Sequence, residues 1–174
     1  AALFFPGGVR EVYHQKGEDY KIFWPDKGEF VRAAAKHNAT IVPFAAVGAA
    51  DSVRMIADSD DILQTPGIGD VVRRRMELLP RARDDETFVA PISVPQPPAR
   101  FYFLFMQPVD TSELDYKDRE SCQKVYEGIK QEVESGIDAL LEERTKDPFR
   151  DFAPRVLYQT INNKTAPQPN MFSQ

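Results

Sequence analysis

Apolar residues gather in short runs along this chain, and prolines and glycines separate the runs. Short apolar runs bounded by such residues are typical of core strands. The run RFYFLFM carries aromatic residues at alternate and adjacent positions, which predicts a strand covered on both faces. The runs that we interpret as strands are residues 3–5, 20–24, 40–48 and 100–106.

Other segments repeat apolar residues every three or four positions, which is the spacing of an amphipathic helix. The longest spans residues 118–144, about seven turns at the helical repeat. Residues 80–99 contain five prolines and predict a long surface connection. The remaining predicted helices are residues 29–37, 71–79 and 149–161, with one or two short ones in 52–63.

A helix followed by an apolar strand, after an earlier apolar strand, indicates an α/β fold. We expect a mixed, mostly parallel sheet flanked by helices, in a single domain over residues 1–161, with a flexible tail at 162–174. Residues 3–5 read as a strand already under way, so we expect the domain to be incomplete at its N-terminus. An uncovered strand edge there would make the fragment poorly soluble.

The amino-acid composition argues against several classes of function. The 174 residues are 42% hydrophobic and carry a formal net charge of −5, which argues against non-specific nucleic-acid binding. No apolar run approaches the roughly 18 residues of a membrane-spanning helix. One cysteine and two histidines are too few for a cysteine-rich or histidine-rich metal site, and no cofactor is expected.

The densest polar cluster follows the first strand, at residues 6–11 (PGGVRE), and continues with His14, Lys16, Glu18 and Asp19. Paired glycines let backbone N–H groups approach a ligand, which makes Gly7 and Gly8 candidates for substrate binding. Arg10 is suited to a phosphate or carboxylate. Glu11 can accept a hydrogen bond from a hydroxyl or pair with Arg10. The alternative is a tight turn with a structural Arg–Glu pair.

Other reactive residues have simpler interpretations. His14 is a candidate general base, although no serine or cysteine nucleophile lies near it in sequence, and a structural role is the alternative. His37 falls at a predicted helix end and Cys122 on an apolar helix face, so both are interpreted as structural. Arg73, Arg74 and Arg75 form a solvated face or contact anionic lipid headgroups. Tyr102, Phe103 and Phe105 belong to a core or line an acyl-chain site.

Residues 4–48 contain the series PGG-x-RE, KGE-x-YK, WP, GEFVR and IVPF. This series, with residues 101–111, 124–137 and 147–159, resembles the plant phytyl ester synthase and diacylglycerol acyltransferase family. The family is more distantly similar to the glycerolipid acyltransferase superfamily. The resemblance covers nearly the whole chain and identifies it as the C-terminal part of the acyltransferase domain.

The resemblance implies an O-acyltransferase that moves a fatty acyl group from acyl-CoA or another acyl donor, such as acyl carrier protein or a galactolipid. The implied acceptors are phytol and diacylglycerol, and the products are phytyl esters or triacylglycerol. It also implies a place in the chloroplast, at plastoglobules or a lipid-droplet surface. An α/β-hydrolase-like region precedes the acyltransferase region in full-length members.

In the superfamily, residues 5–10 correspond to a Phe-Pro-Glu-Gly-Thr-Arg block that holds the acyl acceptor. Gly7 stands where that block has glutamate, which favours an uncharged acceptor alcohol. Gly7, Gly8, Arg10 and Glu11 are therefore the expected acceptor-site residues. The superfamily's catalytic His-x4-Asp pair precedes the Pro-Gly-Gly turn, whereas in this chain His14, with Glu18 four and Asp19 five residues on, follows the turn. We therefore expect the catalytic pair upstream of Ala1 and expect no transferase activity from residues 1–174 alone.

Two other functions stay open. The chain can be a non-catalytic remnant that binds a lipid or a partner. It can also be a hydrolase fragment that uses His14, although it lacks the Gly-x-Ser-x-Gly nucleophile motif.

Overall fold

The computed structural model describes residues 1–12, 14–76 and 89–169. The chain divides into two units. One comprises Ala1–Phe23 with Val53–Gln96, and the other comprises Trp24–Ser52 with Pro97–Gln174. The single domain expected over residues 1–161 and the flexible tail expected at 162–174 stay predictions.

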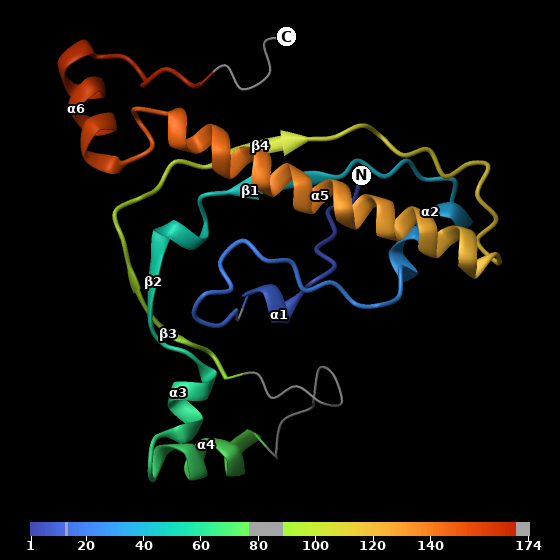
Figure 1. The fold of residues 1–174 in the computed structure, drawn as a ribbon, viewed down its shortest axis with the longest axis horizontal. Coiled ribbons are helices and arrows are strands. Elements are labelled where there is room, and N and C mark those ends of the chain that lie inside the picture. Colours follow the sequence, from blue (N-terminus) through green and yellow to red (C-terminus); the bar gives the residue numbers. More distant parts are fainter. Residues whose placement is uncertain (13, 77–88, 170–174) are drawn as a thin grey trace. The chain divides into compact units, whose positions relative to one another are not determined.

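The second unit is built on a long helix and a two-stranded sheet. Strands β1 (Phe44–Val47) and β4 (Tyr102–Phe105) pair antiparallel, with Phe44 opposite Phe105. Helix α5 (Arg119–Lys146) runs along this sheet (Figure 1). Gly136 permits the close approach, because a Cβ there would lie 2.1 Å from Met106 Cε and 3.3 Å from Ala45 Cβ.

Helix α5 confirms the longest predicted helix. Asp118 caps its first turn by accepting hydrogen bonds from the backbone N–H groups of Glu120 and Ser121, both at 3.1 Å. Apolar positions at helical spacing then turn one stripe of the helix into the core. The buried residues of this stripe are Cys122, Tyr126, Ile129, Val133, Gly136, Ile137 and Leu140.

Helix α2 (Glu29–Lys36) packs against α5 through an aromatic cluster. The ring of Tyr126 lies 5.9 Å from Trp24 and 5.6 Å from Phe30, between centroids. The Tyr126 hydroxyl donates to the carbonyl of Pro25. The loop that leads into α2 is therefore fixed to α5 by both packing and a hydrogen bond.

A buried polar network joins the end of α5 to the start of β4. Asp147, only 3% exposed, accepts hydrogen bonds from the Tyr102 hydroxyl at 2.6 Å and from Arg100 at 2.9 Å. Arg100 also donates to the carbonyl of Ala166 at 2.9 Å. The segment after helix α6 (Phe152–Asn162) is thereby tied to the sheet.

The face of the sheet turned away from α5 carries exposed aromatic rings. Tyr102 is 4% exposed, whereas Phe103 is 52% and Phe105 69% exposed. Phe101 and Phe103 stack with centroids 6.4 Å apart. The prediction of a strand at residues 100–106 is confirmed over β4, but the prediction that both faces are covered is wrong.

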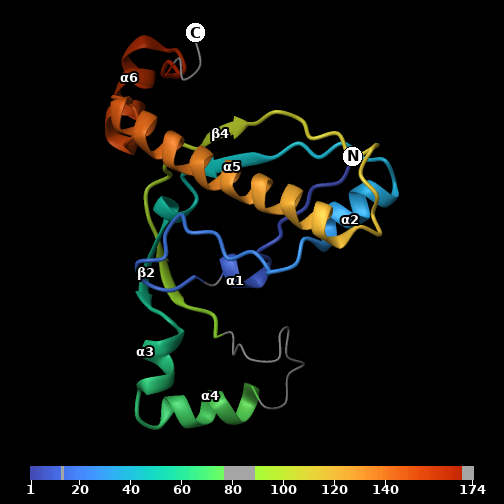
Figure 2. The same ribbon diagram turned by 45° about the vertical axis from the view of Figure 1, so that its right-hand side comes forward.

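The first unit contains a second antiparallel pair, β2 (Val53–Ala57) with β3 (Ile92–Pro95), seen side by side in Figure 2. A bulge interrupts the register between Met55 and Ala57. Helices α3 (Ser59–Gln64) and α4 (Ile68–Met76) follow β2. Asp58 and Asp61 form a capping box at the start of α3, each carboxylate accepting the other's backbone N–H.

The structure corrects the predicted sheet. The fold is mixed α/β, but both described sheets are antiparallel, so the prediction of a mostly parallel sheet is wrong. A helix between two apolar runs is compatible with either direction. Here the run at β1 pairs with a strand much later in the chain, with Phe44 opposite Phe105.

Two predicted strands do not form. Residues 3–5 and 20–24 have no strand structure, and Leu3, Phe4 and Phe5 are 60–69% exposed. An apolar run becomes a strand only where a second segment supplies hydrogen bonds, and none pairs with these runs in the described part of the chain. The run at 40–48 is a strand only over β1, with an added bridge between Ile41 and Val109.

The predictions for residues 52–63 and 80–99 agree with the structure only in part. The expected short helices at 52–63 are a 3₁₀ turn (Ala50–Ser52), β2 and α3. The expected connection at 80–99 contains β3, while its residues 80–88 lie outside the described structure. Predicted helices 29–37 and 149–161 are confirmed as α2 and α6, and helix 71–79 as α4 up to Met76. Among the helices described, none has the length and apolar character needed to span a bilayer.

Candidate functional site

The predicted site begins with a tight turn at residues 6–8. The Gly8 N–H donates to the carbonyl of Phe5 at 3.2 Å, and Gly8 has a left-handed backbone with φ of +54°. Glycine adopts this conformation without the steric cost that a side chain adds. Helix α1 (Val9–Val12) starts directly afterwards and carries Arg10 and Glu11.

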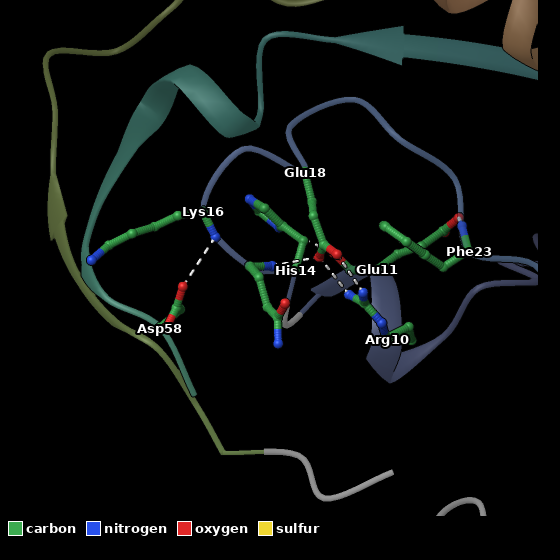
Figure 3. Close-up of polar contacts among 8 residues, drawn as sticks. Arg10, Glu11, His14, Lys16, Glu18, Phe23 and Asp58 are labelled. Atoms are coloured by element: carbon green, nitrogen blue, oxygen red, sulfur yellow. Dashed lines mark hydrogen bonds and ion pairs between the residues drawn. The ribbon is translucent and has the colours of Figure 1, made fainter. Parts of the chain in front are cut away.

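Arg10 is held by Glu18. Its Nη1 and Nη2 donate to Glu18 Oε2 and Oε1 at 2.8 and 2.7 Å, a two-pronged ion pair drawn in Figure 3. The guanidinium carbon also lies 3.8 Å from the centroid of the Phe23 ring. The side chains of Arg10 and Glu18 are only 16% and 18% exposed. An Arg–Glu pair of the kind expected as the alternative is therefore present, and Glu18 forms it.

Glu18 is fixed by a second contact. The backbone N–H of Gln15 donates to Glu18 Oε2 at 2.7 Å. The hydrogen bond from Arg10 is the largest cause that lowers the pKa of Glu18, and burial opposes it. Glu18 is thus a carboxylate that stays ionised well below neutral pH.

Glu11 closes the space above the first glycine of the turn. Its Oε1 accepts the backbone N–H of Phe23 at 3.0 Å (Figure 3). A Cβ added to Gly7 would fall 1.9 Å from Glu11 Cδ, and Gly7 is buried. Gly7 is therefore covered by Glu11, whereas Gly8 is exposed and has no atom within 4 Å of where a Cβ would stand. The open approach to the turn lies beside Gly8.

His14 lies close to this cluster, but its ring is engaged. Nδ1 is 3.3 Å from the carbonyl of Glu11, and Nε2 is 3.2 Å from Asp19 Oδ1. Both neighbours are oxygen acceptors, so in this arrangement neither nitrogen turns a lone pair toward an incoming alcohol. The geometry supports a structural role for His14 over a role as general base.

The loop after α1 is linked to α3. The backbone N–H of Lys16 lies 3.4 Å from Asp58 Oδ2, and its ammonium pairs with Asp61. Both side chains of the Lys16–Asp61 pair are about half exposed, so we interpret it as an ordinary surface ion pair and not as a binding site. Of the residues that the structure describes, no three His, Cys, Asp or Glu side chains gather as metal ligands would.

The structure places the other singled-out residues outside this cluster. His37 caps the C-terminus of α2, and its backbone N–H donates to the carbonyl of Ala34 at 3.1 Å. Cys122 is buried in the α5 core, where burial raises the pKa of its thiol. Arg74 and Arg75 are exposed on α4.

The sequence places the four residues of the turn and Glu18 in one polar cluster, but nothing in it indicates Phe23 as a partner. Gly7, Gly8, Arg10 and Glu11 lie together because they are neighbours in the chain. Glu18 and Phe23 join them only because residues 14–22 fold back toward α1. The acidic residue eight positions after Arg10 was the one available signal for the ion pair.

Over 176 residues, or 96% of the chain, the sequence is 40% identical to Phytyl ester synthase 2, chloroplastic, of Arabidopsis thaliana. Over 180 residues, or 97% of the chain, it is 38% identical to Phytyl ester synthase 1, chloroplastic, of the same plant. The chain is homologous to part of a phytyl ester synthase. The predicted resemblance to this family is confirmed. The chain spans 25% of the length of each relative. No protein-family model and no solved structure matches it.

Proposed function

We propose that this chain is the acceptor-binding part of an O-acyltransferase that transfers a fatty acyl group to phytol. The observation that carries the proposal is the 40% identity to Phytyl ester synthase 2 along 96% of the chain. Identity spread over both units is what a shared fold and substrate would require. The names of both relatives also support a place in the chloroplast, and we extend this to plastoglobules or a lipid-droplet surface.

The reaction needs a general base, an acyl donor and an acceptor hydroxyl held in the correct position. The base removes the hydroxyl proton, and the oxygen forms a bond to the acyl carbonyl carbon. The bond between that carbon and the donor's leaving group then breaks, and the proton passes to the leaving group. We assign the base to a His-x4-Asp pair outside residues 1–174, because the match to this spacing in the chain, His14 with Asp19, follows the turn instead of preceding it. Both ring nitrogens of His14 are also engaged, by Asp19 and by the carbonyl of Glu11. Acyl-CoA or another acyl donor fits this scheme.

The turn at residues 6–8 is the proposed place of the acceptor hydroxyl. The space beside Gly8 is open, and Arg10, clamped between Glu18 and Phe23, keeps α1 and the turn in position. Glu11 fixes the turn from the other side through Phe23. Phytol is the favoured acceptor, and diacylglycerol is a second alcohol of the same uncharged class. We base this assignment on the resemblance of residues 5–10 to the acceptor-binding block of the glycerolipid acyltransferase superfamily.

A chimaeric enzyme tests the proposal. The matched quarter of Arabidopsis Phytyl ester synthase 2 is replaced by residues 1–174, and phytyl esters formed from phytol and acyl-CoA are measured by mass spectrometry. We expect the chimaera to form phytyl esters and the isolated chain to form none. A folded chimaera without product, beside an active parent enzyme, would refute the proposal and favour a non-catalytic lipid- or partner-binding remnant.

A further inference from the structure

We propose that Glu18 makes the acceptor site selective for uncharged alcohols by occupying the anion-binding edge of Arg10. Glu18 would act through Arg10 as a positioning and specificity-determining residue. The inference rests on the proposed function, since it concerns the acceptor of that same site. It assigns this selectivity to a residue that the likeness to phytyl ester synthases does not identify.

The geometry of Arg10 carries the argument. Arginine recognises a phosphate or carboxylate by donating two parallel hydrogen bonds from one edge of its guanidinium. In this chain that edge already donates both bonds to Glu18, at 2.8 and 2.7 Å. One face of the guanidinium lies over the Phe23 ring. An anionic acceptor would have to displace a carboxylate that is already bound in the favoured geometry.

Glu18 is also difficult to displace. Gln15 donates its backbone N–H to Glu18 Oε2 at 2.7 Å, so the carboxylate is bound from two sides. The pair is largely shielded from solvent, with side-chain exposures of 16% and 18%. Shielding strengthens the attraction between the two charges relative to a pair in water. The positive charge of Arg10 is therefore satisfied before any substrate arrives.

The discrimination between acceptors follows from this pairing. A phosphate-bearing alcohol would have to break the Arg10–Glu18 pair to gain the same two hydrogen bonds, whereas a neutral long-chain alcohol needs no such exchange. Removing the charge of Glu18 should shift the preference toward anions, because the edge of Arg10 would then no longer hold a carboxylate.

Binding of inorganic phosphate to residues 1–174 tests this directly. Glu18→Gln keeps the shape of the side chain and removes its charge. We expect Glu18→Gln to bind phosphate at least about tenfold more tightly than the parent in calorimetric titrations, which corresponds to the gain of one charge-assisted interaction. The double variant Arg10→Gln/Glu18→Gln should lose the gain, which a purely structural role of Glu18 would not produce.

Asp61→Asn is the matched control, because it removes one carboxylate from the Lys16–Asp61 pair of the same unit and leaves Arg10 untouched. Equal phosphate affinity in Glu18→Gln, Asp61→Asn and the parent would overturn the proposal. Glu18→Ala is the second variant. If neither Glu18 variant keeps the circular dichroism of the parent, Glu18 is a brace of the fold and the proposal is also overturned.

The same variants in the chimaera separate this inference from the proposed function. Phytol and lysophosphatidate are offered together, and the ratio of their acylated products is measured. We expect Glu18→Gln to shift the ratio toward the phosphate-bearing product. A chimaera that makes phytyl esters with an unchanged ratio refutes the role of Glu18 alone. A chimaera that makes no ester refutes the proposed function, while the phosphate titration still decides the role of Glu18.

Discussion

The carboxylate of Glu11 lies where a side chain on Gly7 would be. A Cβ at Gly7 would stand 1.9 Å from Glu11 Cδ and 2.3 Å from Glu11 Oε2. The other carboxylate oxygen of Glu11 accepts the backbone N–H of Phe23. The absence of a side chain at Gly7 therefore leaves room for Glu11 to accept the hydrogen bond from Phe23.

Gly7→Ala should displace Glu11 and break this hydrogen bond. We expect a loss of about 1–3 kcal/mol of unfolding free energy from overpacking. The amide hydrogen of Phe23 should exchange faster, which nuclear magnetic resonance can measure. Glu11→Ala should relieve the clash, so the double variant should lose less stability than the sum of the two single variants, with a coupling of about 0.5–3 kcal/mol. Strict additivity would contradict the contact.

Two glycines in the second unit should respond to alanine in opposite directions. A Cβ at Gly28 would fall 2.5 Å from Tyr126 Cβ, so Gly28→Ala should destabilise the unit by about 1–3 kcal/mol. Gly128 is exposed in the middle of α5 with no atom near a Cβ, so Gly128→Ala should stabilise it by about 0.5–1 kcal/mol. Denaturant unfolding of both variants measures the signs, and the same sign for both would contradict this packing.

Tyr102→Phe should weaken the buried network at the end of α5. Burial alone would raise the pKa of Asp147, but hydrogen bonds from Tyr102, the Phe149 N–H and Arg100 outweigh it and lower the pKa overall. Removing the Tyr102 hydroxyl should cost about 1–3 kcal/mol of unfolding free energy. Tyr116→Phe, at a side chain 36% exposed, is the control and should cost less than about 0.5 kcal/mol. Equal losses would place Tyr102 outside the network.

The Arg10–Glu18 pair should give a defined pH dependence. The pKa of Glu18 is lowered from about 4.5, so the folded state binds its proton more weakly than the unfolded chain does. The contribution of the pair is therefore complete above about pH 4.5 and is lost as the pH falls further toward the folded pKa. The stability difference between the parent and Glu18→Gln should shrink below about pH 4.5 in unfolding experiments. A difference that stays constant to about pH 3 would contradict the assignment.

The sequence predicted those features that depend on local spacing. Helix α5 was predictable because its apolar positions repeat over 28 residues and Asp118 supplies a cap at its start. The strand at Tyr102–Phe105 was predictable from its aromatic run. The turn residues Gly7 and Gly8 were predictable because glycine pairs mark such turns.

Features that depend on distant partners were not predictable in the same way. The direction of β1 is set by its pairing with β4, nearly 60 residues later, and the apolar pattern of β1 is the same for either direction. The runs at 3–5 and 20–24 have the composition of strands but no strand partner among the described residues. The pairing of Arg10 with Glu18 depends on how the intervening loop folds, and charge alone allowed Glu11 equally well.

The acceptor-side assignment of the turn is the central claim, and the Michaelis constants of the chimaera for its two substrates test it most directly. Gly8→Ala places a methyl group in the open space beside the turn, while Gly67→Ala does the same at another glycine with left-handed backbone (φ +80°) and open surroundings in the same unit. We expect Gly8→Ala to raise the constant for phytol several-fold and leave the constant for acyl-CoA unchanged, with Gly67→Ala changing neither. A rise for acyl-CoA instead, or equal effects of the two variants, would contradict the assignment.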